Sequence, residues 1–201
     1  MTIDADLDLL VRRRIETAEQ IHRAALDLFE AQGLRETTVQ QIAQRAGVSP
    51  RTFFRYFAVK ERAAFPAQGR VFAMVDAVRL DAGAADAAAA FDAVASAIEG
   101  FLAVDAPQGE SQRVALLITR EPELETFVGT QDGELAVRIR TRLAEIAPRL
   151  TSVELHMVAA GVIALWRATW DLWGSAVRAG APSTPADIFR TARTALSRTV
   201  T

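Results

Sequence analysis

Hydrophobic positions along the 201-residue chain recur with the period of α-helices, and no segment shows the alternation of a convincing β-strand. From Ile15 to Phe29 apolar residues recur at steps of three and four, and Gly33 follows. Shorter amphipathic runs cover residues 38–46 and 50–57. Beyond Lys60 the pattern predicts helices near residues 84–104, 110–121, 133–147, 152–179 and 185–199. Breaks are expected at Pro66, Gly83, 105–109, Pro122, 129–133, Pro148 and 180–185. The sequence therefore predicts an all-α fold.

Residues 38–60 have the outline of a helix-turn-helix. Thr38 can cap the first helix with its hydroxyl. Gly47 stands where a left-handed residue ends that helix without a Cβ penalty. Ser49 can cap the second helix, and Pro50 suits its first position because the missing N–H is not needed there. Both helices of the motif therefore have predicted ends.

The second helix of this motif has an apolar side and a cationic side. Phe53 and Phe57 lie four residues apart and are expected to point inward, whereas Arg51, Thr52 and Arg55 remain outside. A helix-turn-helix would present this outer side to DNA. A helical hairpin with no nucleic-acid role would show the same local pattern, so this alternative stays open.

Charge is distributed unevenly along the chain. Residues 12–62 hold ten Arg or Lys and six Asp or Glu, whereas residues 63–201 hold thirteen basic and sixteen acidic residues. The net charge of the whole chain is −2. A basic segment in an acidic protein favours contact with phosphate at that segment.

Residues 14–62 resemble the N-terminal domain of TetR-family transcriptional regulators. The resemblance covers the apolar run of the first helix and a series in the motif, namely Thr38, Val39, Ile42, Ala43, Ala46, Gly47, Val48, Ser49, Thr52, Phe53, Tyr56, Phe57 and Lys60. It implies a three-helix DNA-binding domain within residues 1–62 and a helical-bundle domain for ligand binding and dimerisation over residues 63–201. It further implies a homodimer, paired through residues 152–199, that represses from a palindromic operator until a small molecule releases it.

Eight residues are candidate DNA contacts. They are Thr38, Arg45, Ser49, Arg51, Thr52, Arg55, Tyr56 and Lys60. The resemblance implies phosphate contacts by Thr38 and Lys60 and base reading at the start of the second motif helix. Arg51 suits guanine, whose O6 and N7 a guanidinium reaches together, although a contact with phosphate alone is the alternative. Phe54 departs from the family pattern because it lacks a hydroxyl, which makes Tyr56 the better phosphate candidate.

Three consecutive arginines, Arg12 to Arg14, stand where the first helix is expected to begin. The helix dipole disfavours positive charge at that end. A basic arm that reaches the minor groove is one interpretation, and a solvated leader is the other. The acidic residues before them are expected to be mobile.

Three tryptophans, Trp166, Trp170 and Trp173, follow one face of the most apolar predicted helix. They are expected either in the core or at an interface, or partly in a ligand pocket. Such a pocket needs apolar walls and a few polar groups. We therefore expect an apolar or aromatic ligand, whose identity the sequence does not reveal. The candidate ligand-binding residues are Phe72, Phe101, Leu117, Arg120, Phe127, His156, Arg167 and Trp170.

The sequence contains few residues or motifs typical of a catalytic site or a metal site. The chain has no cysteine and two histidines, and it contains neither a Gly-rich phosphate loop nor a G-x-S-x-G elbow. Glu19 and His22 supply one Glu-x-x-His spacing, whereas a di-metal bundle needs two. We expect that the chain is not an enzyme and that it binds neither a cofactor nor a metal ion. The alternatives are a helical-bundle enzyme or metal protein, and a DNA-binding protein without an effector. No membrane span is expected, since the longest apolar run is short, and a cytoplasmic location fits.

Overall fold

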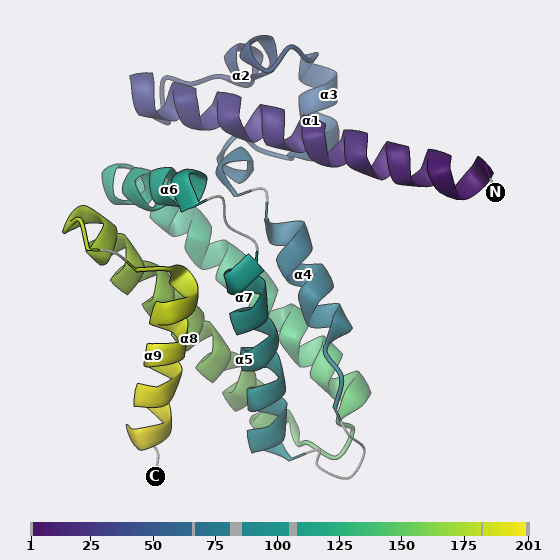
Figure 1. Ribbon diagram of the computed structural model, residues 1–201, viewed down its shortest axis with the longest axis vertical. Coiled ribbons are helices and arrows are strands. Elements are labelled where there is room, and N and C mark those ends of the chain that lie inside the picture. The colour runs from purple at the N-terminus through teal and green to yellow at the C-terminus, as the bar shows by residue number, and fades with distance from the viewer. Residues whose placement is uncertain (1, 66, 81–85, 105–107, 182, 200–201) are drawn as a thin grey trace. The chain divides into compact units, whose positions relative to one another are not determined.

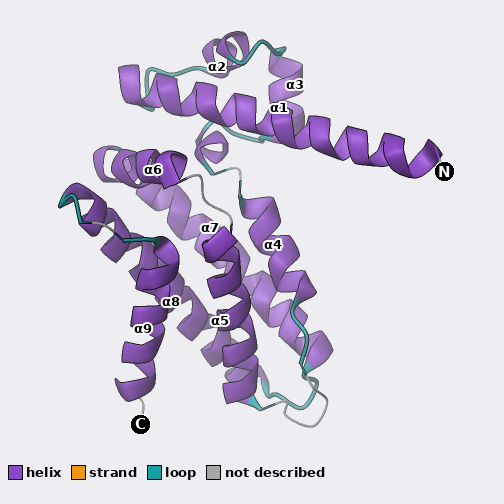
Figure 2. Ribbon diagram, in the orientation of Figure 1, coloured by secondary structure: helices purple, strands orange, loops and turns teal. Residues whose placement is uncertain are grey.

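The computed structural model describes residues 2–65, 67–80, 86–104, 108–181 and 183–199, and the side chains of these residues except 2–12, 108, 122 and 199. Within these ranges the secondary structure consists of helices without strands (Figure 1, Figure 2), which confirms the all-α prediction. The chain forms two compact units, Met1–Ala67 with Leu117–Leu124, and Gln68–Leu116 with Glu125–Thr201. The sequence did not associate residues 117–124 with the N-terminal unit, and the domain boundary at residue 62 stays a prediction.

The first unit contains α1 (Thr2–Gln32), α2 (Val39–Arg45), α3 (Pro50–Tyr56) and the 3-10 helix η1 (Glu61–Ala64). Helix α1 packs against α2 and η1, and α2 packs against α3. The apolar stripe of α1 supplies most of the core, which α2 and α3 complete with Ile42 and Phe53, both fully buried. The apolar positions that recur with the helical period therefore pack the three helices together, with one side of α3 buried against the others.

The ends of the two motif helices follow the predicted signals. Thr38 accepts a hydrogen bond from the backbone N–H of Gln41, and the Gln41 side chain accepts one from the Thr38 N–H, which forms a capping box. Ser49 caps α3 by accepting from the Thr52 N–H, with Pro50 at the first position. Gly47 adopts a φ of +68°, the left-handed conformation expected for it.

Helix α1 begins earlier than the sequence suggested. The expected start lay at Arg12 to Arg14, after a mobile acidic leader, but the helix runs from Thr2. Acidic residues favour the positively polarised end of a helix, and residues 4–8 carry three aspartates. The arginines therefore stand in the interior of α1, so the predicted helix start was wrong, and the mobility of the acidic leader stays a prediction.

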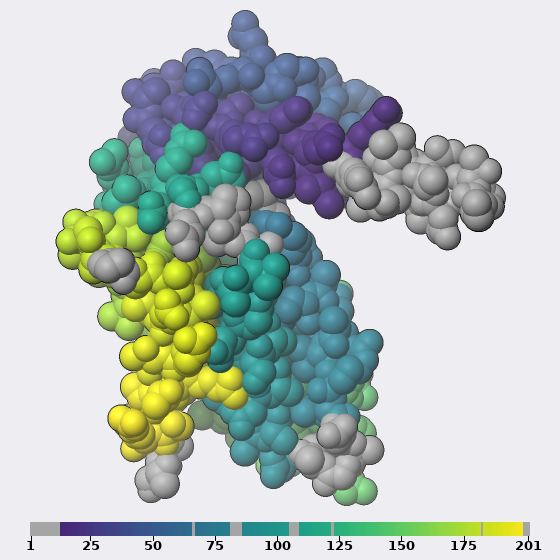
Figure 3. All heavy atoms as spheres, in the orientation of Figure 1, coloured from purple at the N-terminus to yellow at the C-terminus, as the bar shows by residue number. Residues whose placement is uncertain are grey.

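The second unit is built from α4 (Gln68–Ala77), α5 (Ala87–Val104), α8 (Ser152–Arg178), α9 (Pro185–Thr199) and most of α6 (Gln108–Arg120) and α7 (Pro122–Ile146). Helix α5 packs against α4, α8 and α9, and α8 packs along α9. The space-filling view shows α5 and α9 side by side (Figure 3). Their shared core is aliphatic, with Ile98, Ile139, Leu143 and Val162 fully buried.

Helix α7 runs through the break that was predicted at residues 129–133. A Cβ added to Gly129 would lie 3.1 Å from Nη2 of Arg167 on α8, so glycine allows a close side-chain approach here and does not end the helix. The predicted start near residue 133 was therefore wrong. Pro122 occupies the first position of α7, where its fixed φ favours a helix.

Helix α5 is long and apolar enough to cross a membrane by length and composition, with a mean hydropathy of 1.6 over Ala87–Val104. Alanines make up much of this segment, so it does not stand out as a long run of large apolar residues in the sequence. Val94, Ala95 and Ile98 of this helix are buried in the core of the second unit. Core helices of soluble proteins pass the same test, so this feature is weak evidence for a membrane span.

The tryptophans of α8 form a continuous row. Trp166 and Trp170 meet edge to face at 5.3 Å between ring centroids, and Trp170 and Trp173 meet similarly at 5.7 Å. Trp173 is buried and donates its indole N–H to the Ser183 carbonyl at 3.1 Å. Trp166 and Trp170 are half-buried and pack against the aliphatic core. The row therefore contributes to the core of the second unit.

Candidate nucleic-acid interface

The outward side of α3 presents two cations and one aromatic ring. Arg51, Phe54 and Arg55 are exposed, whereas Phe53 on the opposite side is fully buried. Within the described part of the chain, no hydrogen bond or ion pair joins Arg51 to another residue. Spacings of three and four residues put these exposed side chains on one helical face. This face can approach the edges of bases and their phosphates.

The two hydroxyls at the start of α3 are bonded to each other. Ser49 Oγ and Thr52 Oγ1 lie 3.0 Å apart, and Ser49 Oγ also accepts from the Thr52 N–H at 3.0 Å. Ser49 is exposed and Thr52 is half-buried. A hydroxyl has one donor and two acceptor positions, so this arrangement leaves capacity for a further partner.

Tyr56 and Arg55 are neighbours at the end of α3. The Arg55 guanidinium lies 5.3 Å from the centroid of the Tyr56 ring, a cation–π distance. Tyr56 is half-buried, and Phe57 follows it as the C-cap of the helix. The stacked ring holds Arg55 at the exposed edge of α3.

Arg45, at the end of α2, has an intramolecular partner. Its Nε and Nη2 donate to the same carboxylate oxygen of Asp27 on α1, at 3.2 and 2.9 Å. Both side chains are partly exposed. The carboxylate offsets part of the charge that Arg45 would offer to a phosphate.

Lys60 lies in the connection between α3 and η1. Its ammonium donates to the carbonyl oxygens of Leu34 at 2.6 Å and Thr37 at 2.8 Å, and it lies 3.4 Å from that of Arg35. These carbonyls belong to the turn between α1 and α2. An ammonium has three donors, and in this structure all three point at the backbone of that turn.

The same turn also contacts Glu121 and Glu123 of the α6–α7 corner. Glu121 accepts a hydrogen bond from the Leu34 N–H at 3.1 Å, and Glu123 pairs with the exposed Arg35 at 2.7 Å. The sequence offered no signal for these pairs because their members lie more than eighty residues apart. Thr38, at the end of this turn, uses its hydroxyl within the capping box.

The predicted ligand-binding residues divide between the two units. Leu117 and Arg120 belong to the segment that joins the first unit, whereas the other six belong to the second unit. Phe72 and Phe101 pack against the aliphatic core with Trp170. His156 is exposed and its Nδ1 lies 2.8 Å from the Ser152 carbonyl of its own helix.

Arg167, another predicted ligand contact, has a carboxylate partner. Its Nε donates to Oδ2 of the buried Asp132 at 2.5 Å. Burial raises the pKa of Asp132, and the hydrogen bond from Arg167 acts against this shift. Half of the Arg167 side chain remains exposed, so water reaches one side of the pair.

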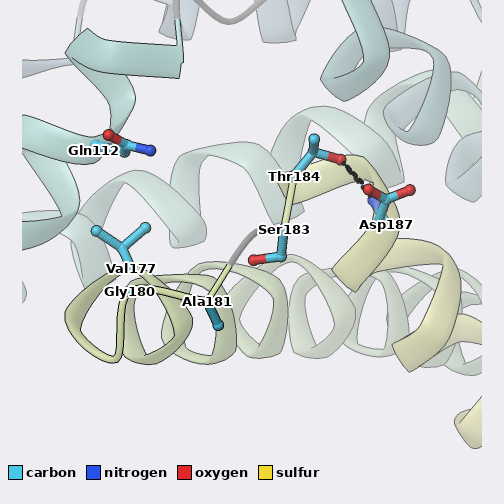
Figure 4. Close-up of a pocket in the computed structure, with 7 residues that line it drawn as sticks. All are labelled: Gln112, Val177, Gly180, Ala181, Ser183, Thr184 and Asp187. Carbon is cyan, nitrogen blue, oxygen red and sulfur yellow. Dashed lines mark hydrogen bonds between the residues drawn. The ribbon is translucent and has the colours of Figure 1, made fainter.

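A hollow of about 630 Å³ lies between α6 and the turn from α8 to α9 (Figure 4). None of the predicted ligand-binding residues lines it. Thr184 donates to the Asp187 carboxylate at 2.7 Å on one wall, and Gln112 contributes an amide. These polar groups do not match the apolar or aromatic ligand that the sequence predicted.

His22 of the Glu-x-x-His spacing packs inside the first unit. It is buried, and its Nδ1 lies 2.8 Å from the Ala63 carbonyl of η1. Among the described residues, His, Asp and Glu side chains form no group of three or more that could hold a metal ion. His22 therefore belongs to the packing between α1 and η1.

Comparisons with known proteins agree on the first unit. Residues 21–62 match the family model described as bacterial regulatory proteins, tetR family. The chain is 55% identical over 53 residues to the HTH-type transcriptional regulator TcmR of Streptomyces glaucescens, covering 26% of this chain and 24% of that protein. It is 45% identical over 49 residues to MftR of Mycobacterium tuberculosis, covering 24% and 25%. The matches span about a quarter of each relative.

Solved structures of regulators resemble the chain over most of its length. NalD, the secondary repressor of the MexAB-OprM multidrug efflux pump in Pseudomonas aeruginosa, aligns over 91% of this chain and 96% of its own, with a TM-score of 0.47 and 17% identity. The regulator SCO7518 of Streptomyces coelicolor A3(2) aligns over 88% and 96%, with a TM-score of 0.43 and 22% identity.

Proposed function

Because residues 21–62 match the family model of bacterial regulatory proteins of the tetR family, we propose that the whole chain is a DNA-binding transcriptional regulator. The observation that carries this proposal is the capped helix-turn-helix whose second helix exposes Arg51 and Arg55. A short helix with exposed cations on one side and a buried opposite side suits the major groove.

The cations on α3 have different roles in this proposal. Arg51 stands in the first turn, without an ion pair among the described residues, and binds guanine O6 and N7. Arg55 and Tyr56, at the other end of the helix, contact phosphate, whereas the hydroxyls of Ser49 and Thr52 lie at its base-reading start. Arg45 shares its charge between Asp27 and the DNA backbone.

The test is selection of sequences from a random duplex library by the purified full-length chain, followed by footprinting on its own upstream DNA. We expect an enriched palindrome with half-sites about 34 Å apart. Arg51→Ala should alter base preference at one position of each half-site. The matched control Arg35→Ala removes an exposed arginine that pairs with Glu123 and should leave the preference unchanged. Equal losses on every sequence would remove the base-reading role of Arg51.

Homodimerisation through α8 and α9 is part of the proposal. Val153 and Met157 are 69% and 67% exposed, and Ala160 and Ala164 continue the same exposed face of α8. Apolar side chains at these steps are suited to pack against a second copy of the helix. The two-fold symmetry of such a dimer would match a palindromic operator.

A pair of matched variants tests the dimer surface. Val153→Glu on α8 should yield monomers in sedimentation experiments and weaken operator binding. Val137→Glu changes a 52% exposed valine of α7, and it should leave the dimer intact. Equal sedimentation of both variants and the wild-type protein would exclude α8 as the interface.

We further propose that a small apolar or aromatic molecule releases the repressor from DNA. Phe72, Phe101 and Trp170 are half-buried beside the core of the second unit and could contact such a molecule. The effector must bind one conformer more tightly than the other, because equal affinity shifts no population. A screen for compounds that release the operator tests this part; if none releases it, the regulator acts without such an effector.

A further inference from the structure

The exposed face of α3 includes an aromatic ring whose position core packing does not explain. Phe54 is 57% exposed, while Phe53 and Phe57 fill the core. The Phe53 ring meets Phe54 edge to face at 5.6 Å, which limits the orientations available to the exposed ring. Much of its apolar surface therefore remains in water.

The neighbours of this ring indicate what could cover it. Phe54 lies three residues after Arg51 and directly before Arg55, and all three side chains are exposed. Two guanidinium groups beside an apolar ring complement a surface that combines acceptors with an apolar group. The major groove offers this combination, because thymine carries a C5-methyl group among the acceptors of the base edges and the phosphates.

We propose that Phe54 reads the C5-methyl group of a thymine in each operator half-site, an inference that rests on the proposed DNA binding. Three residues advance a helix by about 4.5 Å along its axis. Successive base pairs are spaced at about 3.4 Å, so the thymine lies within one or two base pairs of the guanine bound by Arg51. The half-site thus contains a guanine and a thymine read by neighbouring side chains.

Replacement of thymine by uracil tests this contact, because it removes only the methyl group. Each thymine of the selected operator is replaced in turn, and the dissociation constant of the wild-type protein is measured. Burying one methyl group predicts about a fourfold loss at one thymine per half-site, and about sixteenfold when both half-sites are changed. Equal affinity for every substituted operator would overturn the proposal.

Variants assign the effect to the ring. Phe54→Ser should bind the thymine and uracil operators equally, whereas the control Val59→Ser, at a 43% exposed valine after α3, should discriminate like the wild-type protein. Both changes are at exposed positions, and circular dichroism would verify that both variants fold. Discrimination that persists in Phe54→Ser would refute the role of Phe54. Failure of the wild-type protein to enrich any sequence would instead refute the proposed DNA binding.

Discussion

Replacing Lys60 by methionine tests whether its ammonium holds the turn between α1 and α2. Methionine keeps a similar apolar stem and removes the charge. Two strong contacts would be lost, at 2.6 Å to the Leu34 carbonyl and 2.8 Å to the Thr37 carbonyl. A hydrogen bond to a charged group contributes roughly 1.5 to 3 kcal/mol. Because Lys60 is half-buried, water replaces part of this interaction, and we expect a net loss of about 2 kcal/mol.

Hydrogen exchange provides an assay that resolves the two units. The free energy of opening should fall by about 2 kcal/mol for amides of α1 to α3 and remain unchanged for amides of α8 in the same molecule. Arg55→Met is the control, since it removes an exposed cation without backbone partners in the described chain. That variant should change the exchange by less than about 0.5 kcal/mol.

The sequence suggested a different role for Lys60, a contact with phosphate, and this role makes the opposite prediction. Loss of one phosphate contact lowers the slope of log affinity against log salt by about 0.9. If Lys60 holds the turn, Lys60→Met keeps the slope while its first unit opens more easily, and Arg55→Met lowers the slope. Unchanged exchange together with a reduced slope for Lys60→Met would refute the backbone role.

Three further changes probe the units separately. Arg167→Met leaves the buried Asp132 without its cation and should destabilise the second unit by about 2 kcal/mol in denaturant unfolding followed by tryptophan fluorescence; adding Asp132→Leu should restore most of the loss. Hydrogen bonds from the Thr151 backbone and hydroxyl hold the pKa of Glu154 below its ordinary value, so its stabilisation of α8 is present above about pH 4.5 and is lost as the pH falls through the lowered pKa. Glu154→Gln should abolish that pH dependence of the thermal midpoint. Gly47→Ala places a Cβ at a φ of +68°. It should lower the free energy of opening, measured by hydrogen exchange, by about 1 kcal/mol for amides of α2 and α3.

Helix ends were predictable from the sequence wherever the determining contacts are local. Thr38, Ser49 and Thr151 each cap a helix through an N–H three residues away. Gly47 takes the left-handed conformation for a reason that also lies within its own turn. Short-range chemistry of this kind is written in neighbouring residues, which is why the motif segment was interpreted largely correctly.

The errors arose where distant contacts override local preference. Residues 129–133 suggested a break because they contain two glycines, but Gly129 faces the Arg167 guanidinium of α8 and remains helical. The contacts of Glu121 and Glu123 with the turn after α1 were also not predicted. Nothing near these residues in the sequence indicates their partners, since such contacts depend on how the helices pack.

The cations of the first unit show why composition alone could not assign the DNA contacts. Arg45, Arg51, Arg55 and Lys60 all belong to the basic segment, yet the structure gives Arg45 a carboxylate and Lys60 three carbonyl neighbours. Moving either group to a phosphate would break existing interactions, which reduces the net gain from binding. Arg51 and Arg55 lose no comparable hydrogen bond among the described residues. Base discrimination should therefore concentrate on the exposed face of α3, whereas changes at Arg45 should alter affinity for all sequences alike.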